Sequence, residues 1–600
     1  MATFSAIRLA KALVAGMLIA RFAQAFVQQP HRSSGMPLRT LNQASLNNMF
    51  MSADAFDYVI VGGGTSGCVL ANRLSEKKGS KVLVLEAGGS SDNKLIKVPT
   101  ATVKLFRSMF DWVFESHKEK ACADRDIYLP RGKALGGSSC INVMLYHRGD
   151  KKDYEKWSEA TGARHLWSPD SVLPYFKKAE ANKVMKNSEY HNQGGLMSVD
   201  HVQYQNPLSK MFLSACKNLG FAEKEDFNDW SQSQEGVGRF QVTQKRGRRW
   251  TSAMSYLKKA KRRSNLEVET NAHATKVTVE DGKAKSVIYR QGDELVEAKV
   301  APEGEILLTA GAIQSPHLLM LSGIGDENEL QQHNIPVVQN LPGVGKNMQD
   351  HPAVVVARDA EDIGLSHALF KKGTNEVRPL QALKWALTGK GPLTSVGCDH
   401  GGFFKTKPDL ESPDVQLRFI AGRGNNPDGL AAYTEIGQSE NGFRPGISLQ
   451  VIGIRAKSQG TVKLASANPM DKPRVESGFL TNPEDVETLK NGIKIARQIA
   501  ESDAFEGKVH QEVFPGKEIN DDASMEQYIR STVHTANAIV GTCRMGRRDD
   551  PEAVVDPELK VIGVDGLRVV DSSVMPNIPG GQTGAPTVML AEKAADLIMA

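Results

Sequence analysis

A strand, a glycine-rich turn, a helix and a second strand follow one another from residue 57, and this order restricts the fold more than any other feature. The stretch reads DYVIVGGGTSGCVLANRLSEKKGSKVLVLEAGG. Gly62 permits a sharp turn, Gly64 lets the backbone approach a pyrophosphate, and Gly67 lets the helix pack closely on the strand. Glu86 ends the second strand, where a carboxylate can bind a ribose hydroxyl pair. The segment therefore predicts a βαβ unit that holds a dinucleotide.

The length and charge of the chain restrict its class. Its 600 residues, 40% of them apolar, exceed what one small core needs, so we expect two interleaved domains around a large interior. The formal net charge is +5, but the first 53 residues hold five basic residues and no acid. When those five are left out, 69 of the 74 basic residues remain, and their number equals that of the 69 acidic residues. The body has no net charge to attract a polyanion, so nucleic-acid binding is not expected.

The first 53 residues predict a targeting presequence. A basic start, an apolar run at residues 12–20 and a small-x-small cleavage site at residues 23–25 predict a signal peptide over residues 1–25. Residues 26–53 are rich in Ser, Asn and basic side chains, which is typical of plastid transit segments. Together they resemble the bipartite presequences of algae with secondary plastids, so we expect a chloroplast protein. A membrane anchor, for which the run is short, and a secreted protein are the alternatives.

The six cysteines show no CxxC pair and no spacing typical of a metal site. We therefore expect independent thiols in a reducing compartment, and no metal. The cysteines are Cys68, Cys122, Cys140, Cys216, Cys398 and Cys543.

Two further motifs indicate which dinucleotide is bound. RGKALGGSSCINVMLYHRG, residues 131–149, gathers glycines and serines into a loop that can cradle a diphosphate, and GAIQSPHLLMLSGIG, residues 311–325, follows the strand EILLTAG as a helix. Both resemble the two signatures of the glucose-methanol-choline (GMC) oxidoreductase family. The resemblance extends from about residue 55 to the end of the chain. It implies FAD and an α/β fold, with a Rossmann-like FAD-binding domain and a discontinuous substrate domain built on an antiparallel sheet.

The resemblance also implies how the chain is divided and which residues bind FAD. The FAD-binding domain is expected from residues 54–155, 245–350 and 546–600, and the substrate domain from residues 156–244 and 351–545. APTVMLAEKAADLI predicts a helix whose N-terminus, in this family, faces the flavin. The expected FAD-binding residues are Gly62, Gly64, Thr65, Ser66, Gly67, Glu86, Ala87, Leu135, Gly136, Gly137, Ser138, Asn142, Ala274, Asp571, Thr583 and Gly584.

The chain departs from the family where members that oxidise alcohols carry a proton acceptor. The family histidine, three residues before the glycine of a GTCxMG-like segment, corresponds to Ala538 in HTANAIVGTCRMG. The second position, usually His or Asn before an APT-like helix start, is Gly584. Neither residue can accept a proton, and loss of a general base costs a rate factor of about 10² to 10⁴. His534 is the candidate substitute base, whereas Asn537 can form hydrogen bonds but cannot titrate.

Strand alternation predicts a polar face in the substrate domain. In SPDVQLRFI, Val415, Leu417 and Phe419 share one sheet face and Arg418 lies on the other. The same count in GISLQVIGI places Gln450 on the polar side. If the two strands share a sheet, Arg418 and Gln450 lie on one face. An arginine there can orient a carboxylate through a bidentate pair, although a strand arginine is more often an exposed edge charge.

A narrower resemblance gives these residues a function. GPLTSVGCDHGGFF predicts a strand entering a bend, with Cys398 and His400 on one face. A lone cysteine is usually a small buried hydrophobe. However, CDHGGFF, Arg418 twenty residues after Cys398, then Gln450, HTANAIVGTCRMG and NIPGGQTGAPTVM are similar to the algal fatty acid photodecarboxylase branch of the family. That similarity implies that Cys398, Arg418, Gln450 and Asn537 lie at the active site.

The same resemblance implies light-driven decarboxylation of free fatty acids to alkanes or alkenes plus carbon dioxide by photoexcited FAD. The expected partner is a free fatty acid of the C12–C18 class, with peripheral contact to thylakoid lipid and no obligate protein partner. The leading alternative is a light-independent alcohol dehydrogenase or oxidase that uses His534 as its base. A flavin photoreceptor or a non-catalytic flavoprotein is less favoured, because the sequence shows no appended signalling segment or coiled-coil heptads.

Overall fold

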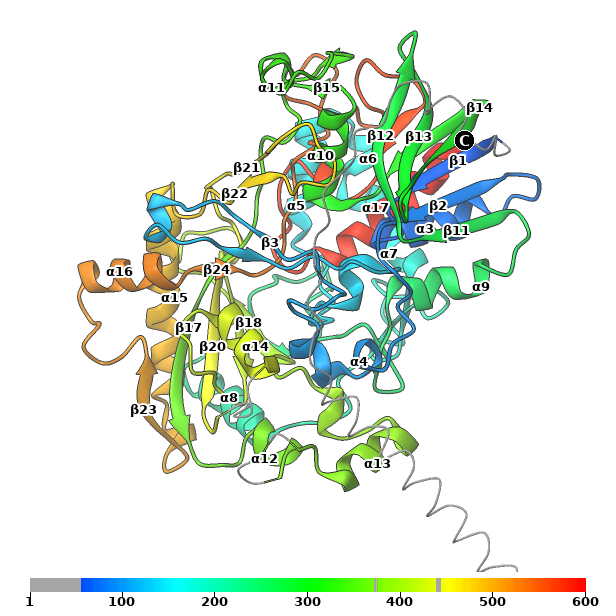
Figure 1. Cartoon of the computed structure of the whole chain (residues 1–600). Helices are drawn as coiled ribbons and strands as arrows, with labels where there is room; N and C mark the ends of the chain where they lie inside the picture. The colour runs from blue at the N-terminus through cyan, green and yellow to red at the C-terminus, as the bar shows by residue number, and fades with distance from the viewer. Residues whose placement is uncertain (1–54, 372–373, 375, 439–443) are drawn as a thin grey trace, which may run out of the picture.

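The computed structural model describes residues 55–371, 374, 376–438 and 444–600. The predicted signal peptide and transit segment, residues 1–53, lie outside the described residues. Two β-sheets occupy different parts of the molecule, one at the upper right of Figure 1 and one at the lower left. Within the described part of the chain, no helix combines the length and apolarity that crossing a membrane requires.

The first sheet has a parallel centre and an antiparallel edge. β1 pairs in parallel with β2 and β14, β11 extends the parallel part beyond β2, and β25 runs parallel to β14. β12 and β13 add antiparallel strands. The strands are β11 (Leu266–Thr270), β2 (Val82–Glu86), β1 (Phe56–Val61), β14 (Glu294–Leu308), β13 (Lys283–Gln291), β12 (Ala272–Glu280) and β25 (Leu567–Val569).

The order of the parallel strands determines where this sheet can bind a ligand. The chain leaves β1 through α3 (Thr65–Leu74) to reach β2 on one side, whereas β14 lies on the other side of β1. The carboxyl ends of β1 and β14 therefore flank a topological switch point, which is where open α/β sheets bind their ligands. Helix α17 (Gly584–Met599) packs on α3, and both are mostly buried.

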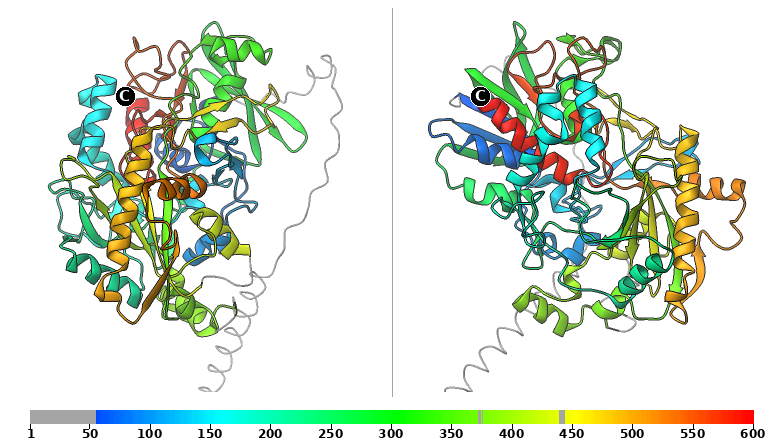
Figure 2. Two further views of the ribbon diagram at one scale, coloured as in Figure 1. Left: turned by 90° about the vertical axis from the view of Figure 1, so that its left-hand side faces the viewer. Right: turned by 180° about the vertical axis from the view of Figure 1, so that it is seen from behind.

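The second sheet is mainly antiparallel. Its strands are β23 (Val509–Phe514), β17 (Pro352–Ala360), β20 (Ile447–Gly453), β19 (Val415–Ile420), β18 (His400–Phe404), β8 (Gly236–Arg239), β7 (Glu223–Lys224) and β24 (His534–Thr535), the last paired with β17. Helix α15 (Pro483–Ala500) lies across one face of this sheet, as Figure 2 shows.

The two faces of this sheet differ as the alternation predicts. Val415 and Leu417 are fully buried in the main core, and Phe419 stacks on Phe212 of α8 (Pro207–Asn218) with ring centroids 4.7 Å apart. Arg418 points to the opposite face, where it lies beside Gln450 of the neighbouring strand. Burying the apolar set under α8 and α15 leaves the polar set to line the interior between the sheets.

The two sheets draw on alternating parts of the chain. Strands of the second sheet lie between β2 and β11, and again between β14 and β25. The predicted α/β fold, with a Rossmann-like domain and an antiparallel substrate domain, is confirmed, while the residue limits assigned to each segment stay predictions.

Candidate active site

One cavity extends from the switch point of the first sheet to β19 of the second. Its wall includes Gly62 after β1, Glu86 at the end of β2, and Thr309 after β14. At the other end it reaches Arg418 and Asn537. The cavity therefore joins the predicted dinucleotide site to the predicted substrate residues.

The glycine turn and the start of α3 form a cradle for an anion. No side chain caps α3 after Gly64, and its first turn holds no acid, so its amides and the positive end of its dipole are open. The second glycine loop closes on the first, because a Cβ at Gly137 would come within 2.8 Å of the Gly64 Cα. The Ser66 hydroxyl is buried with no hydrogen-bond partner among the described residues. These features fit a diphosphate.

Glu86 presents a buried carboxylate beside this cradle. Its Oε2 accepts the Gly63 amide at 2.9 Å, and its Oε1 accepts the Gly88 amide at 2.7 Å. Burial raises the pKa of Glu86, and the two amides oppose that rise. Because Glu86 also lines the cavity, its remaining lone pairs can accept hydrogen bonds from ribose hydroxyls.

Asp571 joins two segments at the far side of the cavity. Its Oδ2 accepts the Gly311 amide at 2.8 Å and the Ser315 hydroxyl at 2.6 Å, and its Oδ1 accepts the Ser573 amide at 2.8 Å. Gly311 and Ser315 begin α10 (Gly311–Leu321), while Asp571 follows β25. With three donors satisfied, Asp571 is a structural acceptor and is poorly placed to remove a proton.

Most of the residues predicted to hold the dinucleotide line this cavity, and the exceptions are Gly67, Leu135 and Gly136. These three hold the glycine turn instead. A Cβ at Gly67 would lie 2.0 Å from the Gly62 carbonyl oxygen, so helix and turn meet there with no room for a side chain. The Gly136 amide donates to the Gly63 carbonyl at 2.7 Å, and the Leu135 side chain lies against Gly63.

Arg418, Gln450 and His534 form a chain of side-chain hydrogen bonds. Nη1 of Arg418 donates to Oε1 of Gln450 at 3.3 Å, and Nε2 of Gln450 lies 2.9 Å from Nε2 of His534. Arginine has no acceptor, so it fixes the orientation of the glutamine amide and makes Nε2 of Gln450 the donor to histidine. His534 must therefore accept at Nε2 and carry its proton on Nδ1, which donates to the Thr532 carbonyl at 3.3 Å.

This arrangement occupies both ring nitrogens of the candidate base. His534 is 1% exposed and does not line the cavity. Burial lowers its pKa, and the nearby Asp428 opposes that shift, so the neutral ring predominates. A histidine whose only lone pair already accepts an amide proton is poorly suited to deprotonate an alcohol.

Arg418 itself is a buried cation at the cavity. It is 6% exposed, its Nε has no hydrogen-bond partner, and no carboxylate within the described ranges forms an ion pair with it. Burial lowers its pKa, while Cys398 and Tyr433 oppose that shift. An unpaired buried charge is costly, so the site favours an anion that enters the cavity.

Cys398 lies two residues before β18, next to Arg418 and Tyr433. Its thiol is 2% exposed, within an apolar cluster that includes the cavity residues Met144 and Leu145. Burial raises its pKa to about 11, although Arg418 lowers it in part. The thiol is therefore protonated at neutral pH. Like Gln450 and His534, it does not itself line the cavity.

Asn537 faces the cavity from a constrained loop. Its φ is 67°, its Oδ1 is buried without a partner, and its backbone carbonyl accepts Nη1 of Arg131 at 3.3 Å. Asp350 holds the same loop by accepting the Ala538 amide at 2.7 Å and the Thr535 hydroxyl. The loop thus presents an amide side chain next to Ala538, the position of the family base.

The two positions of the family's proton acceptors lie on the cavity wall. Ala538 and Gly584 both line it, and a Cβ at Gly584 would meet nothing within 4 Å. Packing therefore does not force the small residue at Gly584. The two histidines of the described cavity wall, His273 and His317, lie on β12 of the first sheet and on α10, and not on the second sheet that carries Arg418.

The comparisons with known proteins decide the family. The model of the GMC oxidoreductase family matches residues 56–353 and 456–591. This chain belongs to the GMC oxidoreductase family. The fit of the glycine cradle, Glu86 and Asp571 agrees with the cofactor of these enzymes, and the protein is an FAD-binding flavoprotein.

Relatives of this GMC oxidoreductase catalyse different reactions. It is 43% identical over 561 residues to "Fatty acid photodecarboxylase, chloroplastic" of Chlamydomonas reinhardtii, with 91% of each chain covered. It is 40% identical to "Alcohol dehydrogenase [acceptor]" of Pseudomonas putida, covering 91% of this chain and 96% of that one. Among solved structures, a variant of formate oxidase from Aspergillus oryzae matches with a TM-score of 0.83 and 26% identity, covering 91% and 98% of the two chains.

Two residues of this GMC oxidoreductase that sequence analysis missed line the cavity. Arg131 lines it with a buried guanidinium, and its Nη2 has no partner among the described residues. Gln582 also lines it and bonds both Gln416 and His147. Arg131 is the first residue of the glycine-serine motif, so its position in the sequence could have indicated that it lies at the site. No sequence pattern indicated the contacts of Gln582, because they join residues far apart in the chain.

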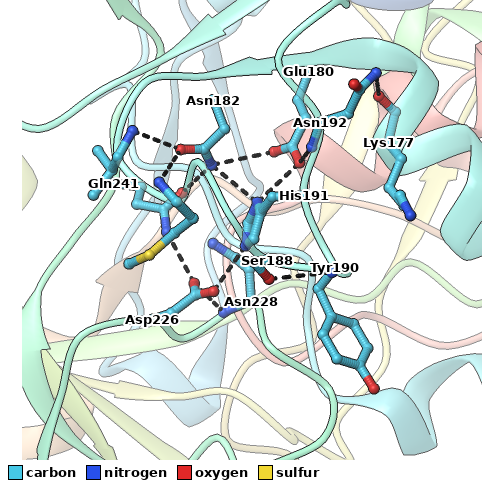
Figure 3. A network of polar contacts seen from close by, with 12 residues as sticks. Lys177, Glu180, Asn182, Ser188, Tyr190, His191, Asn192, Asp226, Asn228 and Gln241 are labelled. Carbon is cyan, nitrogen blue, oxygen red and sulfur yellow. Dashed lines mark hydrogen bonds and ion pairs between the residues drawn. The ribbon is translucent and has the colours of Figure 1, made fainter.

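Figure 3 shows a buried polar network of this GMC oxidoreductase around His191. His191 lies between two carboxylates, with Nδ1 2.8 Å from Oε1 of Glu180 and Nε2 2.7 Å from Oδ2 of Asp226. Arg148 donates to the same Glu180 oxygen at 2.8 Å. Burial disfavours charge on His191, but its hydrogen bonds to Asp226 and Glu180 raise its pKa and favour the doubly protonated ring. Arg148 directly follows His147, so the network anchors the segment that contacts Gln582.

Proposed function

We propose that this flavoenzyme catalyses the light-driven decarboxylation of free long-chain fatty acids to hydrocarbons and carbon dioxide. The observation that supports this most is the buried, unpaired Arg418 at a cavity whose base positions hold Ala538 and Gly584. Such a site favours binding a carboxylate over removing a proton from an alcohol. The similarity to the algal photodecarboxylase supports the same reaction.

An apolar wall suits a fatty chain. Beside Arg418, the cavity is lined by Phe106, Val143, Met144, Leu145 and Ala536. Met144 and Leu145 of that wall belong to the same buried apolar cluster as Cys398. Each methylene group moved from water into such a wall contributes about 0.8 kcal/mol, so the chain supplies most of the affinity.

Arg418 sets the position of the head group. Its free Nε–H can donate to a carboxylate oxygen, while Gln450 holds Nη1 and keeps the guanidinium from turning away. Asn537 adds an amide that can accept and donate hydrogen bonds at the same wall. Both residues keep the carboxylate ionised and directed toward the cofactor part of the cavity.

Bound FAD supplies the photochemistry, because in its excited state it can remove an electron that a carboxylate does not yield in the dark. The net reaction replaces the carboxyl group with hydrogen, RCOOH to RH plus CO₂. After carbon dioxide leaves, the alkyl carbon must therefore receive a proton together with the electron that was removed. Cys398 holds a proton on its thiol beside Arg418 at neutral pH, so it is the candidate for returning it.

A dark alcohol dehydrogenase is the second candidate function, and the similarity to the Pseudomonas putida alcohol dehydrogenase favours it. That reaction needs a base, and His534 has both ring nitrogens occupied. We further propose that the protein acts in the chloroplast, as the similar enzyme of Chlamydomonas reinhardtii is described to do.

Two experiments on the purified holoenzyme distinguish these functions. Blue light with palmitate should give pentadecane by gas chromatography, whereas a parallel dark sample should give none. Anaerobic mixing with alcohols in the dark should leave the flavin yellow. Bleaching by an alcohol without light, together with no pentadecane under light, would replace decarboxylation with alcohol oxidation.

A further inference from the structure

Among the described residues, two of the most exposed large apolar side chains lie on one short helix. On α13 (Pro379–Thr388), Leu380 is 79% exposed and Leu387 is 76% exposed. They are seven positions apart, so they lie on one face of the helix, with the half-buried Leu383 between them. The opposite face buries Trp385 against Leu365, Leu393 and neighbouring apolar residues. The helix is thus fixed on one side and presents leucines to solvent on the other.

A basic hairpin is packed beside this leucine face. It consists of β9 (Gln244–Lys245) and β10 (Arg248–Arg249). The Trp385 indole donates to the Gly247 carbonyl at 2.8 Å, and the Arg248 guanidinium lies 5.1 Å from the Trp385 ring centroid. The exposed cations of hairpin and helix are Lys245, Arg246, Arg248, Lys384 and Lys390.

Acidic side chains are scarce around this surface. Between residues 376 and 391 the only acid is Glu376, and it is bonded to Lys371 at 2.6 Å. The hairpin itself contains none. Exposed leucines flanked by cations on a helix match the chemistry of proteins that lie on anionic bilayers, where apolar residues enter the acyl boundary and basic residues meet the headgroups.

We propose that α13 and the β9–β10 hairpin form a docking surface for an anionic lipid membrane. A second copy of the chain fits less well, because a two-fold contact through this face would bring its cations against those of the partner. The surface goes beyond the proposed reaction and does not depend on it. Docking on a membrane would also bring an enzyme with a lipid substrate close to that substrate. The chain connects the docking helix α13 through η5 (Pro392–Thr394) to Cys398.

A local probe tests contact at the helix itself. All six native cysteines are buried, so Leu387→Cys accepts a nitroxide spin label selectively. The control is Asp293→Cys, a fully exposed site in the turn between β13 and β14. With phosphatidylcholine–phosphatidylglycerol vesicles, oxygen accessibility at position 387 should rise and accessibility to a nickel chelate should fall, while position 293 stays unchanged. An unchanged label at position 387 would refute the proposal.

Vesicle sedimentation of the holoenzyme separates the leucine and charge contributions. Leu380→Ser with Leu387→Ser should weaken binding about tenfold or more. Arg246→Gln and Lys384→Gln should each weaken binding to anionic vesicles about fivefold and change little with neutral ones. The matched control, Val337→Ser with Val338→Ser, alters two exposed valines beside α11 (Glu327–Gln332) and should bind like the parent.

Two further results would also overturn this proposal. In the first, the double leucine variant binds vesicles as tightly as the parent while its flavin absorbance and melting temperature are unchanged. In the second, light scattering finds a parent dimer that the leucine variant converts to a monomer, which would make this face a contact between copies of the chain.

Discussion

Arg418 and Gln450 are direct cross-strand partners on β19 and β20, and the glutamine joins the arginine to His534. This single register pair has two effects at once. It steadies a guanidinium at the cavity, and it occupies the ring nitrogen that an alcohol-oxidising mechanism would need. The same contact therefore helps the site to hold an anion and leaves it without a free base.

Replacing Arg418 by lysine should separate binding of the cofactor from orientation of the substrate. Lysine keeps the charge but loses the planar fork, so decarboxylation should fall about 10²-fold while FAD stays bound. Product formation under blue light and the flavin absorbance measure the two effects. Arg547→Lys, at an arginine whose side chain is 63% exposed, is the matched control and should behave like the parent. Full activity of the Arg418→Lys enzyme would remove arginine from the orienting role.

Gln450→Glu should give Arg418 a carboxylate of its own. The new ion pair would compete with the fatty acid for Arg418. The KM for the fatty acid should therefore rise by about 10- to 100-fold, which corresponds to the loss of one charged hydrogen bond, while the melting temperature should stay unchanged. Gln450→Met places no charge at this position and should raise KM less. If Gln450→Glu and Gln450→Met raise KM equally, Arg418 does not bind the substrate carboxylate.

Restoring the family base should open a dark reaction. Ala538→His places an imidazole on the cavity wall, and Gly584→Asn adds an amide where a Cβ meets no neighbour. The double variant should let a primary alcohol bleach the flavin anaerobically in the dark, with a rate gain of about 10² or more over the parent. Gly584→Ala adds only a methyl group, so a primary alcohol should not bleach its flavin in the dark. Equal bleaching in the parent would show that a base is already present.

The network around His191 should make stability depend on pH. The folded pKa of His191 is raised above its ordinary 6.5, so its contribution is complete below pH 6.5 and is lost as pH rises through the folded value. The pKa values of Glu180 and Asp226 are lowered from 4.5 and 3.8, so their contribution is complete above pH 4.5 and is lost on acidification. In urea unfolding, the parent's advantage over His191→Gln should shrink steadily above pH 6.5. A difference that stays constant up to pH 9 would contradict a charged imidazole.

Local sequence rules predicted much of the site. The glycine turn and Glu86 follow from the short-range order of strand, turn and helix, and the polar face with Arg418 follows from the two-residue period of a strand. Both patterns are contained in a few neighbouring residues. They needed no knowledge of how distant segments meet.

Contacts between distant segments were out of reach. The bond from Gln450 to His534 depends on how β20 and β24 both pair with β17, and the short sequence of β24 gives no register. Leu135 and Gly136 belong to the expected cradle motif, but the Gly136 amide bonds to Gly63 and the Leu135 side chain packs against Gly63, and neither lines the cavity. The exposed leucines of α13 were hidden for the same reason, since only packing decides which helix face is covered.

The most direct test of the central claim measures both products of a carboxyl-labelled fatty acid. Purified holoenzyme with palmitate labelled at the carboxyl carbon should release labelled carbon dioxide and pentadecane in equal amounts under blue light, and neither in the dark. Prolonged illumination that yields no hydrocarbon while FAD and palmitate remain bound would contradict it.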